Sequence, residues 1–380
     1  MKLTCYILSI SFLTFACGQA VQGLESSEPK TPPHTQTKHI KVKHQDSSVI
    51  VKKNTDILKP VMTLASKITG PKQVSRWEPS GIVSSADGIW VVSDREGWIT
   101  YYKLPLNQGD NQPTIAHKLS PKLENRIKWE GLEWERNQEG QITALLLLEA
   151  ISRTVWRCDS PHDGCPRLDK VALEPVNQLL NKSVPSPFKY IMFEGLAYHE
   201  QEILIGVRAF QDKKNGLTPW SLLSNLKGDL LLDARKPLQF EGKEYGMSGV
   251  SFDAEHQGFW ITWSYEDEEG SIQESVKGIL SFSPLKYAKN HKENPNKQAK
   301  SLEFGAKRLD HTLDVGSQIC AVFQMKPEGV SVSEKGDLFV VFDEDLDRKD
   351  AETFKDTKRF ALQDNQDFIY QSTTKALLKQ

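Results

Sequence analysis

The sequence has little net charge, few cysteines and only one long apolar run. Its 380 residues contain 48 lysines and arginines against 50 aspartates and glutamates, a formal charge of −2. This balance excludes the broad basic face that nucleic-acid binding requires. After the N-terminal apolar run, no stretch is long and apolar enough to span a membrane. The signatures of HExxH zinc proteases, P-loop proteins and dinucleotide-binding enzymes are also missing.

The N-terminus has the pattern of a signal peptide. Lys2 precedes an apolar run over residues 3–16, which has the length of a signal core and is too short for an ordinary membrane span. The residues Thr14-Phe15-Ala16-Cys17 resemble a bacterial lipobox, although Thr14 stands where lipoproteins usually have leucine. The alternative is ordinary cleavage after Gly18-Gln19-Ala20. We predict a lipoprotein-type signal over residues 1–17, lipidation of Cys17, and export to the periplasm or outer membrane, otherwise secretion.

Residues 18–58 are rich in proline, lysine, histidine, glutamine and serine. Such a segment buries too little apolar surface to offset the entropy lost on ordering. We predict a flexible tether over 18–58 and a single domain over 59–380.

Two of the five cysteines, Cys158 and Cys165, flank a turn-rich loop. In an exported protein this spacing predicts a disulfide. A zinc site would need two more ligands, and only His162 lies nearby. Cys320 lies in an apolar run over 319–323 and is expected to be a buried small residue.

A short motif recurs five times, and a β-rich run follows each copy. The copies begin at Glu78, Glu130, Glu194, Ser248 and Glu328. Self-similarity over tens of residues indicates a repeat architecture. Because four short antiparallel strands make one propeller blade, we predict an all-β protein, a β-propeller with five visible repeats and five or six four-stranded blades. A sixth blade would lie near 301–323. Residues 367–370 and one N-terminal run, 48–52 or 61–66, would share the last blade and close the ring.

Each repeat reads as a hairpin whose midpoint falls on a turn. The first residue of each motif is therefore expected beside the last residue of its return strand, on one rim of the propeller. This predicts a channel mouth that collects carboxylates, hydroxyls and arginines. The predicted set is Glu78, Asp94, Glu130, Glu149, Glu194, Glu328, Asp343, Arg208, Ser248 and Ser264, with Arg95 adjacent.

Crowded carboxylates either take up protons or hold a cation. Oxygen ligands without histidine or cysteine suit Ca²⁺ or Mg²⁺. We therefore predict that the seven carboxylates form a Ca²⁺ site, and that Arg208, Arg95, Ser248 and Ser264 bind an anionic group beside it. The alternative is structural: the glutamates would accept hydrogen bonds from N–H groups of neighbouring inner strands and lock the blades together.

The repeats resemble a group of bacterial β-propellers that includes the esterase-like (phytase-like) and SdiA-regulated families. The resemblance spans roughly residues 74–345 and rests on residues 78–82, 92–96, 193–197 with 205–208, and 327–330 with 342–343. It implies a propeller, often associated with Ca²⁺, with ester or phosphoester hydrolysis in some members. Ser248 and Arg208 stand where the family pattern has acids.

Two functional hypotheses follow. The first is an exported, lipid-anchored propeller that binds a divalent cation and an anionic ester or phosphoester, with a metal-dependent hydrolase as its enzymatic form. The second is a non-enzymatic surface propeller that binds a protein or glycan partner, because propellers host many functions. Both predict a monomer that meets the membrane only through its lipid anchor. No catalytic residue is assigned.

Overall fold

The computed structural model describes residues 65–73, 77–94, 97–119, 128–171, 188–213, 216–234, 237–265, 276–287, 311–312, 318–323, 325–342 and 366–379. The chain divides into two units, 1–49 and 50–380, and every described residue belongs to the second. The predicted signal, tether and lipidation site (Cys17) lie outside the described residues, as do Arg95 and Asp343. No helix in the described part is long and apolar enough to cross a membrane.

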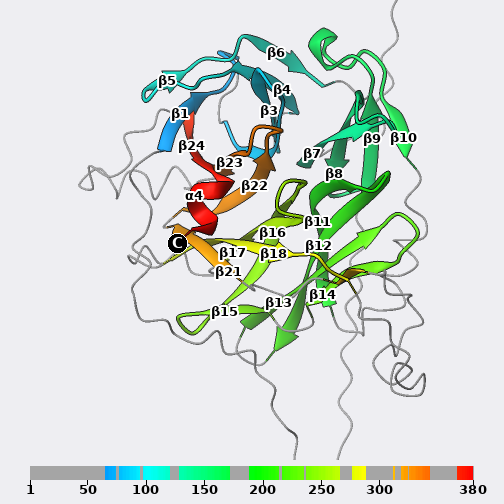
Figure 1. Cartoon of the computed structure of the whole chain (residues 1–380), viewed down its shortest axis with the longest axis vertical. Helices are drawn as coiled ribbons and strands as arrows, with labels where there is room; N and C mark the ends of the chain where they lie inside the picture. Colours follow the sequence, from blue (N-terminus) through cyan, green and yellow to red (C-terminus); the bar gives the residue numbers. More distant parts are fainter. Residues whose placement is uncertain are drawn as a thin grey trace, which may run out of the picture. The chain divides into compact units, whose positions relative to one another are not determined.

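Five sheets of four or five strands form the body of this unit, and each is one propeller blade (Figure 1). Blade 1 contains β2 (Pro79–Ser84), β3 (Gly88–Ser93), β4 (Trp98–Lys103) and β6 (Ile115–Lys118). Blade 2 contains β7 (Trp129–Arg136), β8 (Ile142–Glu149), β9 (Thr154–Cys158) and β10 (Asp169–Val171). Blade 3 contains β11 (Phe188–His199), β12 (Glu202–Lys213), β13 (Gly216–Asn225) and β14 (Leu230–Ala234).

The last two blades each have five strands. Blade 4 contains β15 (Leu238–Phe240), β16 (Lys243–Asp253), β17 (Gly258–Ser264), β18 (Gly278–Pro284) and β21 (Gln318–Phe323). Blade 5 contains β22 (Pro327–Val332), β23 (Asp337–Phe342), β24 (Gln366–Thr373), β1 (Ala65–Thr69) and β5 (Asp110–Asn111). A small separate sheet pairs β19 (Lys286–Tyr287) with β20 (His311–Thr312), and the helical pieces are η1 (Pro161–Asp163) and α4 (Thr374–Leu378).

The innermost strands close a ring. Strand β2 contacts β7, β7 contacts β11, β11 contacts β16, β16 contacts β22, and β22 returns to β2. The two ends of the described chain share blade 5, where β1 pairs antiparallel with β24 and Ala65 lies opposite Tyr370. This pairing covers an edge that would otherwise be open. The predicted propeller and its closure are therefore confirmed, with five blades. Strand β21 pairs with β18 as the outer strand of blade 4, so a sixth blade is not needed there.

The inner strands do not alternate between polar and apolar residues, because both of their faces are buried. In β2 and β3 every residue is buried, since each blade packs between two others. The largest side chains fill the spaces between blades. Trp90 from blade 1, for example, belongs to the same core cluster as Trp129 and Trp134 from blade 2.

Strands β12 and β13 form one long hairpin in which Lys213 lies opposite Gly216. The predicted disulfide between Cys158 and Cys165 is confirmed, with Cα atoms 5.3 Å apart. Cys320 is 1% exposed, as expected for a small core residue.

Candidate metal centre

Each of the five inner strands has a β-bulge at the same place in its motif. The register shifts just before the motif glycine in β2, β7, β11, β16 and β22. The extra residues are Ser80, Glu130, Glu194, Ser248 and Glu328. A bulge bends the strand and re-aims a side chain, so five equivalent side chains are turned at one level of the ring.

The glycine after each bulge lets neighbouring backbones touch. A Cβ atom on Gly81 would lie 2.8 Å from the carbonyl carbon of Gly131 in the next blade. A Cβ atom on Gly329 would lie 2.6 Å from the carbonyl oxygen of Ser80, across the closure of the ring. Glycine is required for such close backbone approach. This contact explains why the motif glycine recurs, and it brings the bulged residues toward the axis.

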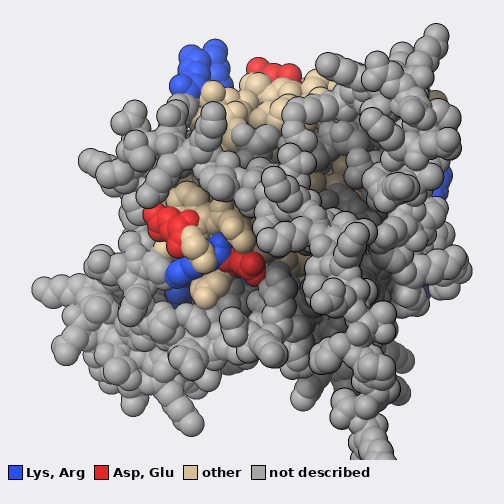
Figure 2. All heavy atoms as spheres, turned by 90° about the horizontal axis from the view of Figure 1, so that it is seen from below, with Lys and Arg blue, Asp and Glu red and all other residues tan. Residues whose placement is uncertain are grey.

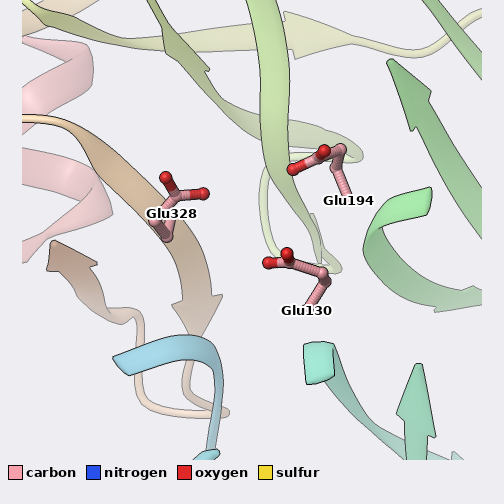
Figure 3. Close-up of side chains that lie close together, drawn as sticks. All are labelled: Glu130, Glu194 and Glu328. Atoms are coloured by element: carbon pink, nitrogen blue, oxygen red, sulfur yellow. The ribbon is translucent and has the colours of Figure 1, made fainter. Parts of the chain in front are cut away.

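Three of the five bulged residues are glutamates whose carboxylates converge. One oxygen each from Glu130, Glu194 and Glu328 lies within 4.8 Å of the others, and these side chains point toward one another from blades 2, 3 and 5 (Figure 3). The three residues are 2%, 1% and 4% exposed. The three glutamates therefore lie in the interior of the protein, whereas the sequence predicted that they would surround an open channel mouth.

A basic side chain contacts each of these glutamates. The Arg208 Nη2 atom lies 3.0 Å from Oε1 of Glu194. The Lys326 Nζ atom lies 2.8 Å from Oε1 of Glu328, and Lys128 Nζ forms an ion pair with Oε1 of Glu130.

Sequence analysis missed the two lysines. A signal was present, because Lys128 and Lys326 each stand two residues before the motif glutamate, in the pattern Lys-x-Glu-Gly.

Glu78 and Asp94 extend this network in blade 1. The Asp94 Oδ2 atom lies 3.8 Å from Lys128 Nζ. Burial, a hydrogen bond with Glu78 and the charge of Glu130 together raise the pKa of Asp94 to about 9. In blade 1 the bulged residue is Ser80. Glu78 therefore stands two residues before the bulge, at the position that Lys128 and Lys326 have in blades 2 and 5. The Ser80 hydroxyl donates to Oε2 of Glu130.

The two other predicted hydroxyls link neighbouring blades. Ser248 Oγ donates to the carbonyl oxygen of Pro327 at 2.6 Å, and Arg208 Nη1 donates to Ser264 Oγ at 2.6 Å. In the structural alternative, the glutamates would accept hydrogen bonds from the N–H groups of the neighbouring blade. Serines three residues later in the motif accept such bonds. There Ser331 and Ser251 accept from backbone N–H groups of the next blade, at 2.8 and 3.1 Å.

Glu149 lies apart from the cluster. It is 2% exposed, and its carboxylate accepts hydrogen bonds from the backbone N–H groups of Ile151 and Ser152 at 3.0 and 2.7 Å. It therefore caps its own turn. The bulge in β7 explains this orientation of the side chain. It places Glu149 opposite Trp129 instead of Glu130, and a shift of one residue turns a strand side chain to the other face.

Burial dominates the electrostatics of the cluster. It raises the pKa of Glu194 to about 8, even though Arg208 opposes the shift. Burial likewise raises the pKa of Glu328, against the effect of Lys326. Among the described residues the network joins five carboxylates to three cations. The members are Glu78, Asp94, Glu130, Glu194, Glu328, Lys128, Arg208 and Lys326.

No protein-family model matches the sequence, and no characterised protein matches it by sequence. Several solved structures match the fold. A thermostable family-43 glycoside hydrolase has 12% identity and a TM-score of 0.44, over 80% of this chain and 92% of that one. The glutaminyl cyclase of Myxococcus xanthus has 9% identity and a TM-score of 0.33, over 82% and 99%. A putative glucose dehydrogenase from Thermus thermophilus has 10% identity and a TM-score of 0.36, over 83% and 99%. The resemblance to the esterase-like and SdiA-regulated families stays a prediction.

Proposed function

We propose that the cluster of Glu130, Glu194 and Glu328 binds one divalent cation, with Ca²⁺ as the first candidate, and that an anionic ester or phosphoester binds beside it. The observation that carries this proposal is the convergence of three carboxylates, each at most 4% exposed, from three different blades. Hard cations such as Ca²⁺ and Mg²⁺ prefer oxygen ligands of this kind.

The shifted pKa values support a cation whose binding displaces protons. Burial raises the pKa of Glu194 and of Glu328, because desolvation disfavours ionised carboxylates. A cation binds the ionised form of these groups, so we expect its binding to release protons.

The basic residues supply the anion-binding part of the proposal. If a cation takes the oxygens of Glu130, the ammonium group of Lys128 loses this partner and becomes able to hold an anionic oxygen. The Lys128 side chain is 37% exposed, so solvent reaches it. A bound divalent ion would supply Lewis acidity and lower the pKa of a bound water.

Calorimetric titration of chelator-treated protein with CaCl₂ and MgCl₂ tests the cation site. We expect Glu194→Gln and Glu328→Gln to weaken Ca²⁺ binding at least tenfold. Glu149→Gln is the matched control, because it neutralises an equally buried carboxylate that caps its own turn. Failure of the wild-type protein to bind millimolar Ca²⁺, or equal loss in the control, would reject the cation site.

Turnover separates the enzymatic form from the alternative, a non-enzymatic surface propeller for a protein or glycan. Ca²⁺-dependent hydrolysis of p-nitrophenyl esters or phosphates, lost in Glu194→Gln, would support a hydrolase. In the alternative, the buried ion would simply tie the blades together. Thermal stabilisation by Ca²⁺ without turnover would support that second role.

Export and a lipid anchor complete the proposal. The Cys158–Cys165 disulfide supports export, because disulfides persist in oxidising compartments. The described charged side chains also suit a small or surface ligand better than nucleic acid. On the face shown in Figure 2, lysines or arginines stand beside aspartates or glutamates near the centre, and further charged side chains of both signs lie at the edges. Metabolic labelling with a radioactive fatty acid, compared between wild type and Cys17→Ser, tests the anchor.

A further inference from the structure

A second site lies at the other end of the inner strands. There the end of β2 and the turns after the inner strands of the other four blades line a cavity of about 390 Å³. Known ligand pockets are about 300–1,000 Å³, so the cavity has room for a small molecule. Strand β7 illustrates the separation, because it begins at the metal centre with Glu130 and ends at the cavity with Arg136.

The inner part of this cavity is a fixed arrangement of one carboxylate and several aromatic side chains. Glu133 and Trp134 line it from blade 2, Tyr198 from blade 3 and Phe252 from blade 4. Glu133 Oε1 accepts from the backbone N–H of Trp134 at 2.7 Å, and Trp134 Nε1 donates to the carbonyl oxygen of Ser84 at 2.8 Å.

The neighbouring blade holds the aromatic wall in place. The Tyr198 hydroxyl donates to the carbonyl oxygen of Arg136 at 2.7 Å. The rings of Phe252 and His199 pack with their centres 4.2 Å apart.

The charges that line the cavity are mostly negative. The described lining has one guanidinium, Arg136, and it already pairs with Glu334 at 2.7 Å. Asp253 is also occupied, since it binds the ring nitrogens of His256 and Trp260, each at 2.9 Å. Glu200 Oε1 lies 3.8 Å from His199 Nε2, so Glu133 inside and the exposed Glu255 at a turn leave the described lining with a negative surplus.

We propose that this cavity binds a small protonated amine, such as the end of a lysine side chain, with its ammonium group toward Glu133 and the ring faces of Tyr198 and Phe252. A carboxylate beside aromatic faces is the combination that binds organic cations, because the ring faces carry negative potential. A neutral sugar could also stack on these rings, but it would gain nothing from the surplus charge.

The test is an NMR or calorimetric titration of the whole protein with n-butylammonium at pH 8, where n-butanol and xylose are the neutral comparators. We expect n-butylammonium to bind at least tenfold more tightly than n-butanol, and Glu133→Gln to abolish this preference. Glu135→Gln is the matched control. It lies two residues along the same strand, where it accepts from Arg157 at 2.7 Å, and it does not line the cavity.

A second variant keeps the test decisive if Glu133→Gln folds poorly. Phe252→Leu removes an aromatic wall and keeps the charge, so it should weaken n-butylammonium at least threefold and leave n-butanol unchanged. Equal binding of amine and alcohol, binding of xylose alone, or an unaffected Glu133→Gln would overturn the proposal. The titration is run in excess chelator and repeated with Glu194→Gln, so failure of the metal centre leaves this result unaltered.

Discussion

At the scale of single residues, the centre of the propeller depends on a pair of positions in each inner strand. The first is the bulged residue, which is a cluster glutamate in three of the five strands, and the second is a glycine that lets the next backbone approach. Glu328 and Gly329 show both functions, since Glu328 joins the cluster and Gly329 touches Ser80 across the closure of the ring. The acidic site and the packing of the blades therefore share a cause.

Replacing such a glycine should loosen the ring. We expect Gly329→Ala to lower the free energy of unfolding by about 1–3 kcal/mol, because its Cβ would overlap a backbone oxygen that cannot move aside. Gly109→Ala is the control, since a Cβ there has no neighbour within 4 Å. Urea unfolding of both variants checks this. Equal stability would show that the backbones do not approach as closely as described.

Glu133 gives a prediction for pH. Burial raises its pKa to about 7, so the folded state holds a proton that the unfolded chain has already released. Its contribution to stability is therefore complete below the ordinary glutamate pKa and is lost as pH rises through 7. We expect wild type to lose about 1–2 kcal/mol relative to Glu133→Gln between pH 5 and pH 8. Urea unfolding at both pH values measures this difference, and parallel curves would contradict it.

At the scale of elements, the inner hairpins decide how much of the site could be predicted. The turns lie at the predicted midpoints, so the sequence was sufficient to place the motif residues at one end of each blade. It could not reveal the bulges, because an extra residue leaves no mark in an apolar run. Hence Ser80 rather than Glu78 lies at the bulge, and Glu149 faces its own turn.

The convergence of the glutamates could be predicted from the sequence more readily than the contacts of the basic residues. Three glutamates before glycines could be predicted to converge, since equivalent residues of a ring share one level. Lys128 and Lys326 could not be assigned from two occurrences in five motifs, because lysine at the start of a strand is usually solvated. Their contacts with Glu130 and Glu328 depend on the ring being closed.

The disulfide in blade 2 gives the prediction for a single element. It joins the end of β9 to the loop after η1, across a sequence separation of 7 residues. We expect Cys158→Ser with Cys165→Ser to cost about 2–3 kcal/mol, because the unfolded chain regains the entropy of a short loop. Thermal unfolding with and without reductant measures this. A double variant as stable as wild type, or a reductant effect that persists in it, would contradict the assignment.

At the scale of the whole molecule, closure joins the ends of the described chain. Strand β1 covers β24 in blade 5, so blade 5 depends on residues more than 290 positions apart, as with Ala65 opposite Tyr370. Every other blade is built from one continuous part of the sequence. The two ends of the described chain therefore pair within blade 5, and β22 of this blade contacts β2 of blade 1.

Removing the pairing of β1 with β24 should open the propeller. A chain that begins at residue 70 lacks β1 and leaves the edge of β24 unpaired, which favours aggregation. A chain that begins at residue 60 keeps β1 and is the control. We expect the shorter chain to unfold at least 10 °C lower and to form oligomers in size-exclusion chromatography. Identical behaviour of the two chains would mean that closure contributes little.

The central claim is that the closed ring holds three glutamates around one divalent cation. An anomalous difference map from crystals grown with Ca²⁺ tests it most directly. The account predicts a peak about 2.3–2.6 Å from an oxygen of each of Glu130, Glu194 and Glu328, with Lys128 and Lys326 moved away from their carboxylates. A map with no peak among these residues, and with all three ion pairs intact at millimolar Ca²⁺, would contradict it.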